Sequence, residues 1–201
     1  EDDRQVVFSG PHFKATFDKQ SGLLVSYRYK KQEFIHNGQG PRPFFWRAPT
    51  DNDYGAKLPV RLKAWKEASY QEPKAESFNV VRDKDTTAVK VTYRFPQTDA
   101  RWDITYKVYS NGVIKVDNHF VAENAQTPMI PRVGLRMQLP ARITSLTYYG
   151  RGPEENYRDR RTSQFIGEYT SGIQDMYEPY VRPQENNHRT DIYWCTLTSK
   201  A

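Results

Sequence analysis

The sequence contains a single cysteine, Cys195, so an internal disulfide is excluded and cysteine use does not identify the compartment. Cys195 lies in the apolar run 192–197, where a buried packing role is expected rather than a reactive thiol. Long apolar runs are also missing, because none approaches the about 20 residues that a membrane-spanning helix needs. No membrane partner is therefore predicted.

A basic stripe is missing as well. The 30 Lys and Arg residues exceed the 24 Asp and Glu residues by six, but the two signs are interspersed along the chain. The one compact basic cluster is Arg158–Arg161, and it contains an aspartate. A nucleic-acid-binding protein concentrates its basic residues on one face, so no nucleic-acid partner is predicted and the net charge of +6 serves solubility.

Short segments of alternating polarity, separated by turn residues, dominate the chain and predict strands. The expected strands are 5–8, 12–17, 23–29, 77–82, 88–95, 102–109, 113–121, 132–139 and 143–149. Asn111-Gly112 between two of them predicts a type I′ hairpin, in which both central residues have positive φ. One short helix is expected at 60–69, where apolar residues follow a helical period. The predicted fold is all-β: one large antiparallel β-sandwich domain over residues 1–201.

The stretch 44–55 passes from three aromatic residues through Arg47 and Pro49 to the polar run Asp51-Asn52-Asp53. Such a passage is typical of a loop at a strand end that faces a ligand or a neighbouring domain. Taken alone, a structural turn is favoured over a binding loop, because Asp and Asn side chains often bond the backbone in turns. Two carboxylates supply only part of the six or more oxygens that calcium needs, so no metal site is predicted in this chain.

Three polar blocks carry a resemblance to a known family. They are RAPTDNDYG at 47–55, YYGRGPEENYRDR at 148–160 and MYEPYVRPQENNHRTD at 176–191. In this order and spacing they resemble signature blocks of the C-terminal, small-chain (domain 5 type) domain of LacZ-type bacterial β-galactosidases, in glycoside hydrolase family 2. The resemblance covers nearly the whole chain.

The resemblance implies a sandwich of the galactose-mutarotase-like type, the last domain of an enzyme that hydrolyses terminal β-D-galactosides with retention. The two catalytic glutamates and a catalytic Mg²⁺ site belong to an upstream barrel in that family, so neither a catalytic residue nor a cofactor is expected here. The implied partners are the rest of the β-galactosidase chain, a galactoside bound by the full-length enzyme, and further copies in a homo-oligomer. A bacterial cytoplasm or periplasm remains open.

The family also implies that a loop after the first block lies at the entrance of the sugar site. The corresponding residues here are the candidates for the rim of the active site: Asp51, Asn52, Asp53, Tyr54 and Gly55. The family domain continues for several strands beyond the position of Ala201, so the chain is expected to be truncated at its C-terminus and inactive alone. An unpaired strand edge is expected near 193–197, where chains would associate.

Glu154 and Glu155 do not form the carboxyl pair of a retaining glycosidase, because neighbouring side chains in extended chain point to opposite faces. The arginines around them would also keep carboxylates ionised. A structural network of ion pairs and hydrogen bonds is predicted instead, with these members: Arg47, Arg151, Glu154, Asn156 and Arg158.

The alternative is a stand-alone carbohydrate-binding or aldose-mutarotase-like module. Mutarotases use a histidine with a glutamate as acid and base, and His188, near Glu185, is the best candidate for that histidine. An isolated histidine is nevertheless more often structural than catalytic.

Overall fold

The computed structural model describes residues 3–83, 86–124, 127–182 and 184–199. The chain divides into two compact units. The first comprises Glu1–Trp46 and Leu62–Pro140, and the second comprises Arg47–Arg61 and Ala141–Ala201. The single sandwich domain expected over 1–201 stays a prediction, and each unit is described by itself.

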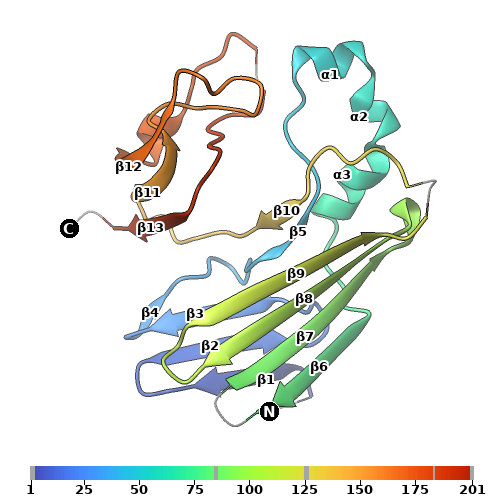
Figure 1. Cartoon of the computed structure of the whole chain (residues 1–201). Helices are drawn as coiled ribbons and strands as arrows, with labels where there is room; N and C mark the ends of the chain where they lie inside the picture. The colour runs from blue at the N-terminus through green and yellow to red at the C-terminus, as the bar shows by residue number, and fades with distance from the viewer. Residues whose placement is uncertain (1–2, 84–85, 125–126, 183, 200–201) are drawn as a thin grey trace. The chain divides into compact units, whose positions relative to one another are not determined.

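The first unit contains two four-stranded antiparallel sheets and a short two-stranded one (Figure 1). The first sheet has the order β1 (Gln5–Ser9), β2 (Phe13–Asp18), β3 (Leu24–Tyr29), β4 (Gln32–Glu33). The second has the order β6 (Ser77–Arg82), β7 (Thr86–Phe95), β8 (Ala100–Tyr109), β9 (Ile114–Ala122). The short sheet pairs β5 (Arg42–Phe44) with β10 (Gly134–Arg136).

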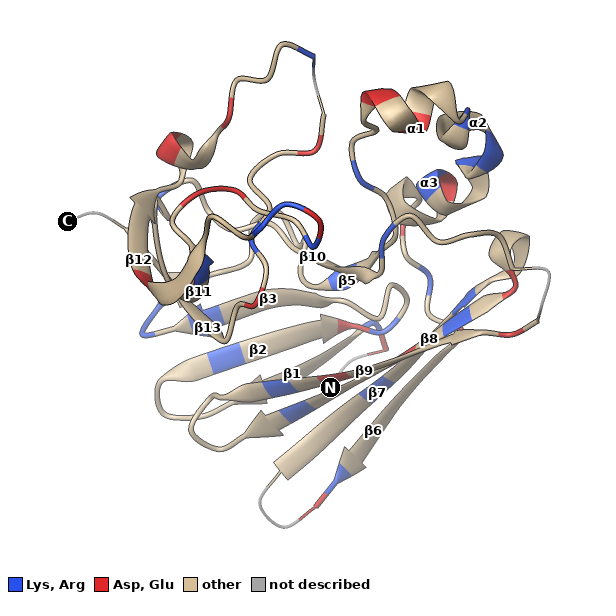
Figure 2. Ribbon diagram, turned by 45° about the horizontal axis from the view of Figure 1, so that its top comes forward, with Lys and Arg blue, Asp and Glu red and all other residues tan. Residues whose placement is uncertain are grey.

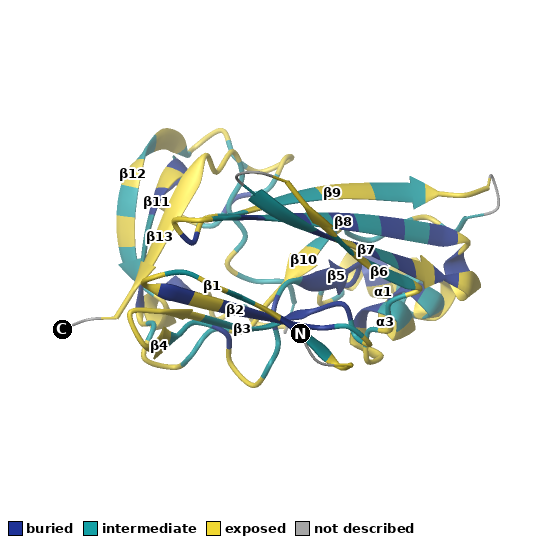
Figure 3. Ribbon diagram, turned by 90° about the horizontal axis from the view of Figure 1, so that it is seen from below, coloured by how far each residue is buried: buried dark blue, intermediate teal, exposed yellow. Residues whose placement is uncertain are grey.

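Alternation along β8 gives this unit its core. Every second residue of the strand is buried: Ala100, Trp102, Ile104, Tyr106 and Val108. Figure 3 shows the same alternation of buried and partly exposed residues along β7 and β8. Contacts between the two sheets, such as Phe17 against Tyr106 at 5.2 Å between ring centroids, make them a sandwich. The all-β antiparallel fold class is confirmed, and the mutarotase-like subtype stays a prediction.

Phe45 is the centre of an aromatic cluster in the first unit and is fully buried. Its ring lies 4.7 Å from Trp65, 5.0 Å from Phe95 and 5.4 Å from Trp102, measured between ring centroids. Edge and tilted contacts of this kind add to the burial energy of each ring. The aromatic run that precedes Arg47 therefore anchors the chain where it leaves the first unit.

The β8–β9 hairpin forms where Asn111-Gly112 predicts it, but its turn is not type I′. Within the turn only Gly112 has a positive φ, 91°, and the Tyr109 amide bonds the Val113 carbonyl at 2.9 Å. This is a three-residue loop that ends in a left-handed glycine, so Asn111 does not need the left-handed conformation. The turn type was wrong, whereas the hairpin and its strands are confirmed.

The described residues contain three short α-helices instead of the single one expected: α1 (Asp51–Gly55), α2 (Leu58–Arg61) and α3 (Lys63–Tyr70). α3 accounts for the helical period, because it buries Trp65 and Ser69 on one face. Two single 3₁₀ turns also occur, η1 (Pro96–Thr98) and η2 (Gln174–Met176). No helix among the described residues is both long and apolar enough to cross a membrane.

The second unit contains a three-stranded antiparallel sheet in the order β12 (Phe165–Gly172), β11 (Ser145–Gly152), β13 (Trp194–Thr198). The central strand β11 runs three residues beyond the expected 143–149. Gly150 pairs with Gly167 and Arg151 with Ile166, so this Gly-rich segment is part of the ladder despite its polarity.

β13 lies at an edge of this sheet. It pairs with β11 on one side, and within the described residues no strand pairs with its other side. All five of its residues are exposed. The expectation of a buried Cys195 was therefore wrong: the thiol is exposed because its strand is at the edge, although the sequence around it is apolar.

Charges of both signs are interspersed along the ribbon (Figure 2). On β8 and β9, for example, Lys107 lies 3.6 Å from Asp117, and Asp103 lies 3.1 Å from Arg101. These pairs are solvated, and each contributes little to stability.

Candidate functional site

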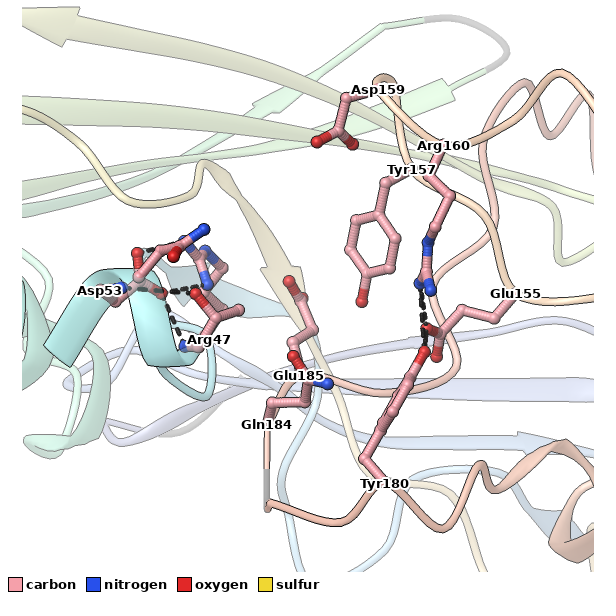
Figure 4. A pocket seen from close by; sticks show the side chains of 11 residues that line it. Arg47, Asp53, Glu155, Tyr157, Asp159, Arg160, Tyr180, Gln184 and Glu185 are labelled. Carbon is pink, nitrogen blue, oxygen red and sulfur yellow. Dashed lines mark hydrogen bonds and ion pairs between the residues drawn. The ribbon is translucent and has the colours of Figure 1, made fainter. Parts of the chain in front are cut away.

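The second unit contains a cavity of about 510 Å³ between the start of α1 and the loops that follow β11 and η2 (Figure 4). Its lining combines charged groups with two tyrosines: Arg47, Thr50, Asn52, Asp53, Glu155, Tyr157, Asp159, Arg160, Tyr180, Gln184 and Glu185. All three blocks that carry the family resemblance contribute to it.

α1 begins with a capping box. The Thr50 amide donates to Asp53 Oδ2 at 2.8 Å, and the Asp53 amide donates to Thr50 Oγ1 at 3.4 Å. These bonds satisfy backbone donors that a helix start leaves open. The Thr50-x-x-Asp53 spacing was the sequence signal for this helix, and the prediction of an irregular loop missed it.

Arg47 fixes the same carboxylate from the other side. Its guanidinium forms a bidentate pair with the Asp53 carboxylate: Nη1 lies 2.6 Å from Oδ2, and Nη2 lies 2.9 Å from Oδ1. Burial alone would raise the pKa of Asp53, but the hydrogen bonds from Thr50 and Arg47 and the positive charge of Arg47 together lower it. Asp53 is therefore an ionised structural group.

The five predicted rim residues form α1 itself. Asn52 and Asp53 line the cavity, whereas Asp51, Tyr54 and Gly55 are exposed on the helix and do not belong to the lining. Asp51 pairs with Arg182 at 3.2 Å, and Tyr54 is 60% exposed.

Glu155 lines the side of the cavity that lies across from α1. Its carboxylate accepts a bond from Arg160 Nη2 at 2.8 Å, and further bonds from the Tyr180 hydroxyl and the Asn187 amide. Burial, together with the hydrogen bond to Glu155, raises the pKa of Tyr180 and keeps its hydroxyl protonated as a donor. Sequence reasoning had not assigned Glu155 or Tyr180 to a site, because their contact spans 25 residues.

Asn156 is fully buried and joins the second and third blocks. Its amide nitrogen donates to the carbonyls of Arg151 and Glu154, each at 3.0 Å. Its amide oxygen accepts from the Thr190 amide at 3.0 Å and from the Thr190 hydroxyl at 2.6 Å. Every bonding position of this side chain is used, as a buried amide requires.

His188 contacts Tyr157 and Asn156 on the same side of the cavity. Its ring stacks on Tyr157 with centroids 4.5 Å apart and planes 10° apart, and its Nδ1 lies 2.7 Å from the Asn156 carbonyl oxygen. A carbonyl accepts but cannot donate, so Nδ1 carries the proton. Within the described residues no carboxylate is hydrogen-bonded to His188, and the mutarotase-like alternative stays a prediction.

The other predicted network members fall into two groups. Arg151 pairs with Asp191 at 2.7 Å and bonds the Gln164 carbonyl at 2.9 Å. Glu154 and Arg158 are exposed, and within the described residues neither side chain forms an ion pair. Of the two neighbouring glutamates, Glu155 and not Glu154 forms the ion pair, with Arg160. Adjacent side chains face apart, so only one of the two reaches the cavity.

Two of the four carboxyl groups in the cavity lining, Asp53 and Glu155, are each paired with an arginine. A retaining glycosidase needs one carboxyl that stays protonated near neutral pH, which requires a raised pKa. Each described carboxyl group whose pKa is clearly shifted has that pKa lowered: Asp18, Glu33, Asp53, Asp117 and Asp191. Among the described residues no three metal-binding side chains gather into a possible ion site.

Comparison with known proteins identifies the family. The family described as beta galactosidase small chain matches residues 9–201. The beta-galactosidase of Priestia megaterium is 35% identical over 199 residues, which cover 99% of this chain and 19% of that protein. The beta-galactosidase of Lactobacillus delbrueckii subsp. bulgaricus is 33% identical, with 97% and 19% covered. That of Vibrio cholerae is 29% identical, with 87% and 18% covered.

The chain thus spans about a fifth of the length of the relatives that it matches, 19% in the first of them. The match runs through all three polar blocks and confirms the resemblance drawn from them. This chain belongs to the beta galactosidase small chain family.

Proposed function

We propose that this chain is a supporting, non-catalytic domain of a longer β-galactosidase, a retaining enzyme of glycoside hydrolase family 2 that acts on terminal β-D-galactosides. One observation carries this proposal: two of the four carboxyl groups in the cavity lining, Asp53 and Glu155, are each held by an arginine, at 2.6 Å and 2.8 Å. A carboxylate in such a pair is a poor proton donor and a hindered nucleophile.

The catalytic glutamates, the Mg²⁺ and the barrel that holds them belong, in this proposal, to the remainder of the enzyme. The partners of this chain are that barrel, the galactoside bound there, and other copies in the oligomer. Coverage of about a fifth of each relative supports this division of labour.

The proposed contribution of this chain to the sugar site is α1. The capping box and the Arg47 pair hold the helix from its buried side, while Asn52 and Tyr54 remain exposed on it. A rim that is already ordered loses little conformational entropy when a sugar binds. Exposed tyrosine and amide groups suit a sugar, which presents both apolar faces and hydroxyls.

The isolated 201-residue chain should not hydrolyse nitrophenyl β-galactoside, because in this proposal the two catalytic glutamates belong to the remainder of the enzyme. The release of nitrophenol under conditions in which a β-galactosidase is active measures this. Turnover that disappears in the Glu155→Gln variant would contradict the proposal, since it would assign the chemistry to this cavity.

Tyr54→Ala in the longer enzyme should raise KM for the galactoside and leave kcat and the melting temperature nearly unchanged. A single aromatic contact contributes about 1 kcal/mol, which corresponds to about a fivefold change in KM. Tyr177→Ala is the matched control, because Tyr177 is 69% exposed and lies outside α1. Equal changes in KM from the two substitutions, or no change from Tyr54→Ala, would contradict the proposal that α1 contributes to the rim of the sugar site.

The Arg47–Asp53 pair should stabilise the second unit in a pH-dependent way. Since the pKa of Asp53 is lowered by folding, the unfolded chain binds the proton first as the pH falls. The stabilisation is therefore complete above the ordinary aspartate pKa of about 3.9 and is lost as the pH falls below it. Asp53→Asn should cost about 2 kcal/mol at pH 7 and much less near pH 3.

Urea unfolding followed by circular dichroism at the two pH values measures this difference. Asp51→Asn is the control, because its pair with Arg182 has side chains 62% and 77% exposed and should contribute little at either pH. An Asp53→Asn cost that is the same at both pH values would show that the ion pair is not the stabilising interaction.

A further inference from the structure

The first unit contains a second, smaller cavity, which the proposed function does not use. Its volume is about 230 Å³, and it lies at the short sheet formed by β5 and β10, whose strands run side by side in Figure 1. Its lining is rich in polar side chains: Gln39, Arg42, Ser69, Tyr70, Arg136, Met137 and Gln138.

Arg42 brings a buried positive charge to this cavity, since the residue is only 9% exposed. All of its hydrogen bonds go to neutral oxygens: Gln39 Oε1 at 3.3 Å, the Ser69 carbonyl at 3.3 Å, and the Gln71 carbonyl. Its Nε is buried and bonds no described group. A buried charge normally requires a partner of opposite charge, because neutral acceptors offset only part of its desolvation.

Arg136 brings a second positive charge to the same place. It is the direct cross-strand partner of Arg42 in the antiparallel β5–β10 pair, so the two side chains leave the same face of that sheet. Its guanidinium lies over the ring of Phe44, 5.1 Å from the centroid, and 6.0 Å from that of Tyr70. Like charges at directly opposed positions destabilise a strand pair.

No described carboxylate forms an ion pair with either arginine. Burial lowers the pKa of Arg42; the negative charge of Glu72 partly offsets this, and the positive charge of Arg136 lowers the pKa again by a smaller amount. The cavity lining therefore holds two cross-strand arginines, and within the described residues no ion pair neutralises either of them. A negative group between them would neutralise both the buried charge and the cross-strand repulsion.

We propose that this cavity binds one small oxyanion between Arg42 and Arg136. Guanidinium groups present forked donors that match the oxygens of phosphate or carboxylate. The side-chain amide of Gln138, which also lines the cavity, adds a further N–H donor. The volume admits a small anion but no oligosaccharide, so this site is independent of galactoside binding.

Calorimetric titration of the 201-residue chain with inorganic phosphate, and separately with acetate, tests the proposal at constant ionic strength. Arg136→Gln is the test variant, because Arg136 is exposed and the chain should still fold. Loss of one charged hydrogen-bond donor should weaken binding by about tenfold or more. Lys14→Gln is the control: it removes one charge from β2, at a different cavity lined by lysines, and should change affinity less than twofold.

Saturable binding of either anion that depends on Arg136 and not on Lys14 supports the site, and the preferred probe then identifies a tetrahedral or a planar oxyanion. Absence of saturable heat from both anions in the millimolar range would overturn the proposal. Equal weakening by both substitutions would overturn it too, because it would indicate attraction to the overall positive charge.

Discussion

One buried amide organises the second unit. Asn156 is fully buried, and its side chain bonds the Arg151 carbonyl of β11, the Glu154 carbonyl of its own loop and two groups of Thr190. A buried amide left unbonded would cost more free energy than a typical hydrogen bond gains, so the burial of this side chain depends on these four contacts. The loop after β11 and the segment near β13 are thereby fixed to one another.

The positions of the reactive groups follow from that arrangement. Glu155 and Tyr157 flank Asn156 in sequence, and the ring of His188 stacks on Tyr157 while its Nδ1 bonds the Asn156 backbone. Glu155 then meets Arg160 and Tyr180, which occupy its oxygens. The carboxylate of Glu155 and the ring of His188 are thus both engaged in contacts within the cavity wall, and the proposed supporting role rests on this arrangement.

The sequence predicted those elements that a local pattern determines, such as a strand with a period of two or a turn with its dipeptide. The alternation of apolar and polar residues with a period of two identifies β7 and β8, whose inner faces form the core. Asn111-Gly112 identifies the β8–β9 hairpin. Sequence reasoning failed where contacts between distant segments decide. Cys195 is exposed because its strand lies at an edge, and Glu155 rather than Glu154 faces the cavity, which local polarity does not specify. The burial of Arg42 opposite Arg136 depends on a pairing across 94 residues, which no local pattern reveals.

Hydrogen exchange at the Thr190 amide tests the central role of Asn156 most directly. This amide donates to Asn156 Oδ1 at 3.0 Å and should exchange slowly in the native chain. In Asn156→Ala its exchange should accelerate by about tenfold or more, since the buried bond is lost, while amides in the β7–β8 ladder keep their protection. The exposed Asn52→Ala should leave Thr190 unchanged. Unaltered exchange of Thr190 in Asn156→Ala would contradict the account, because the two blocks would then be held together by other contacts.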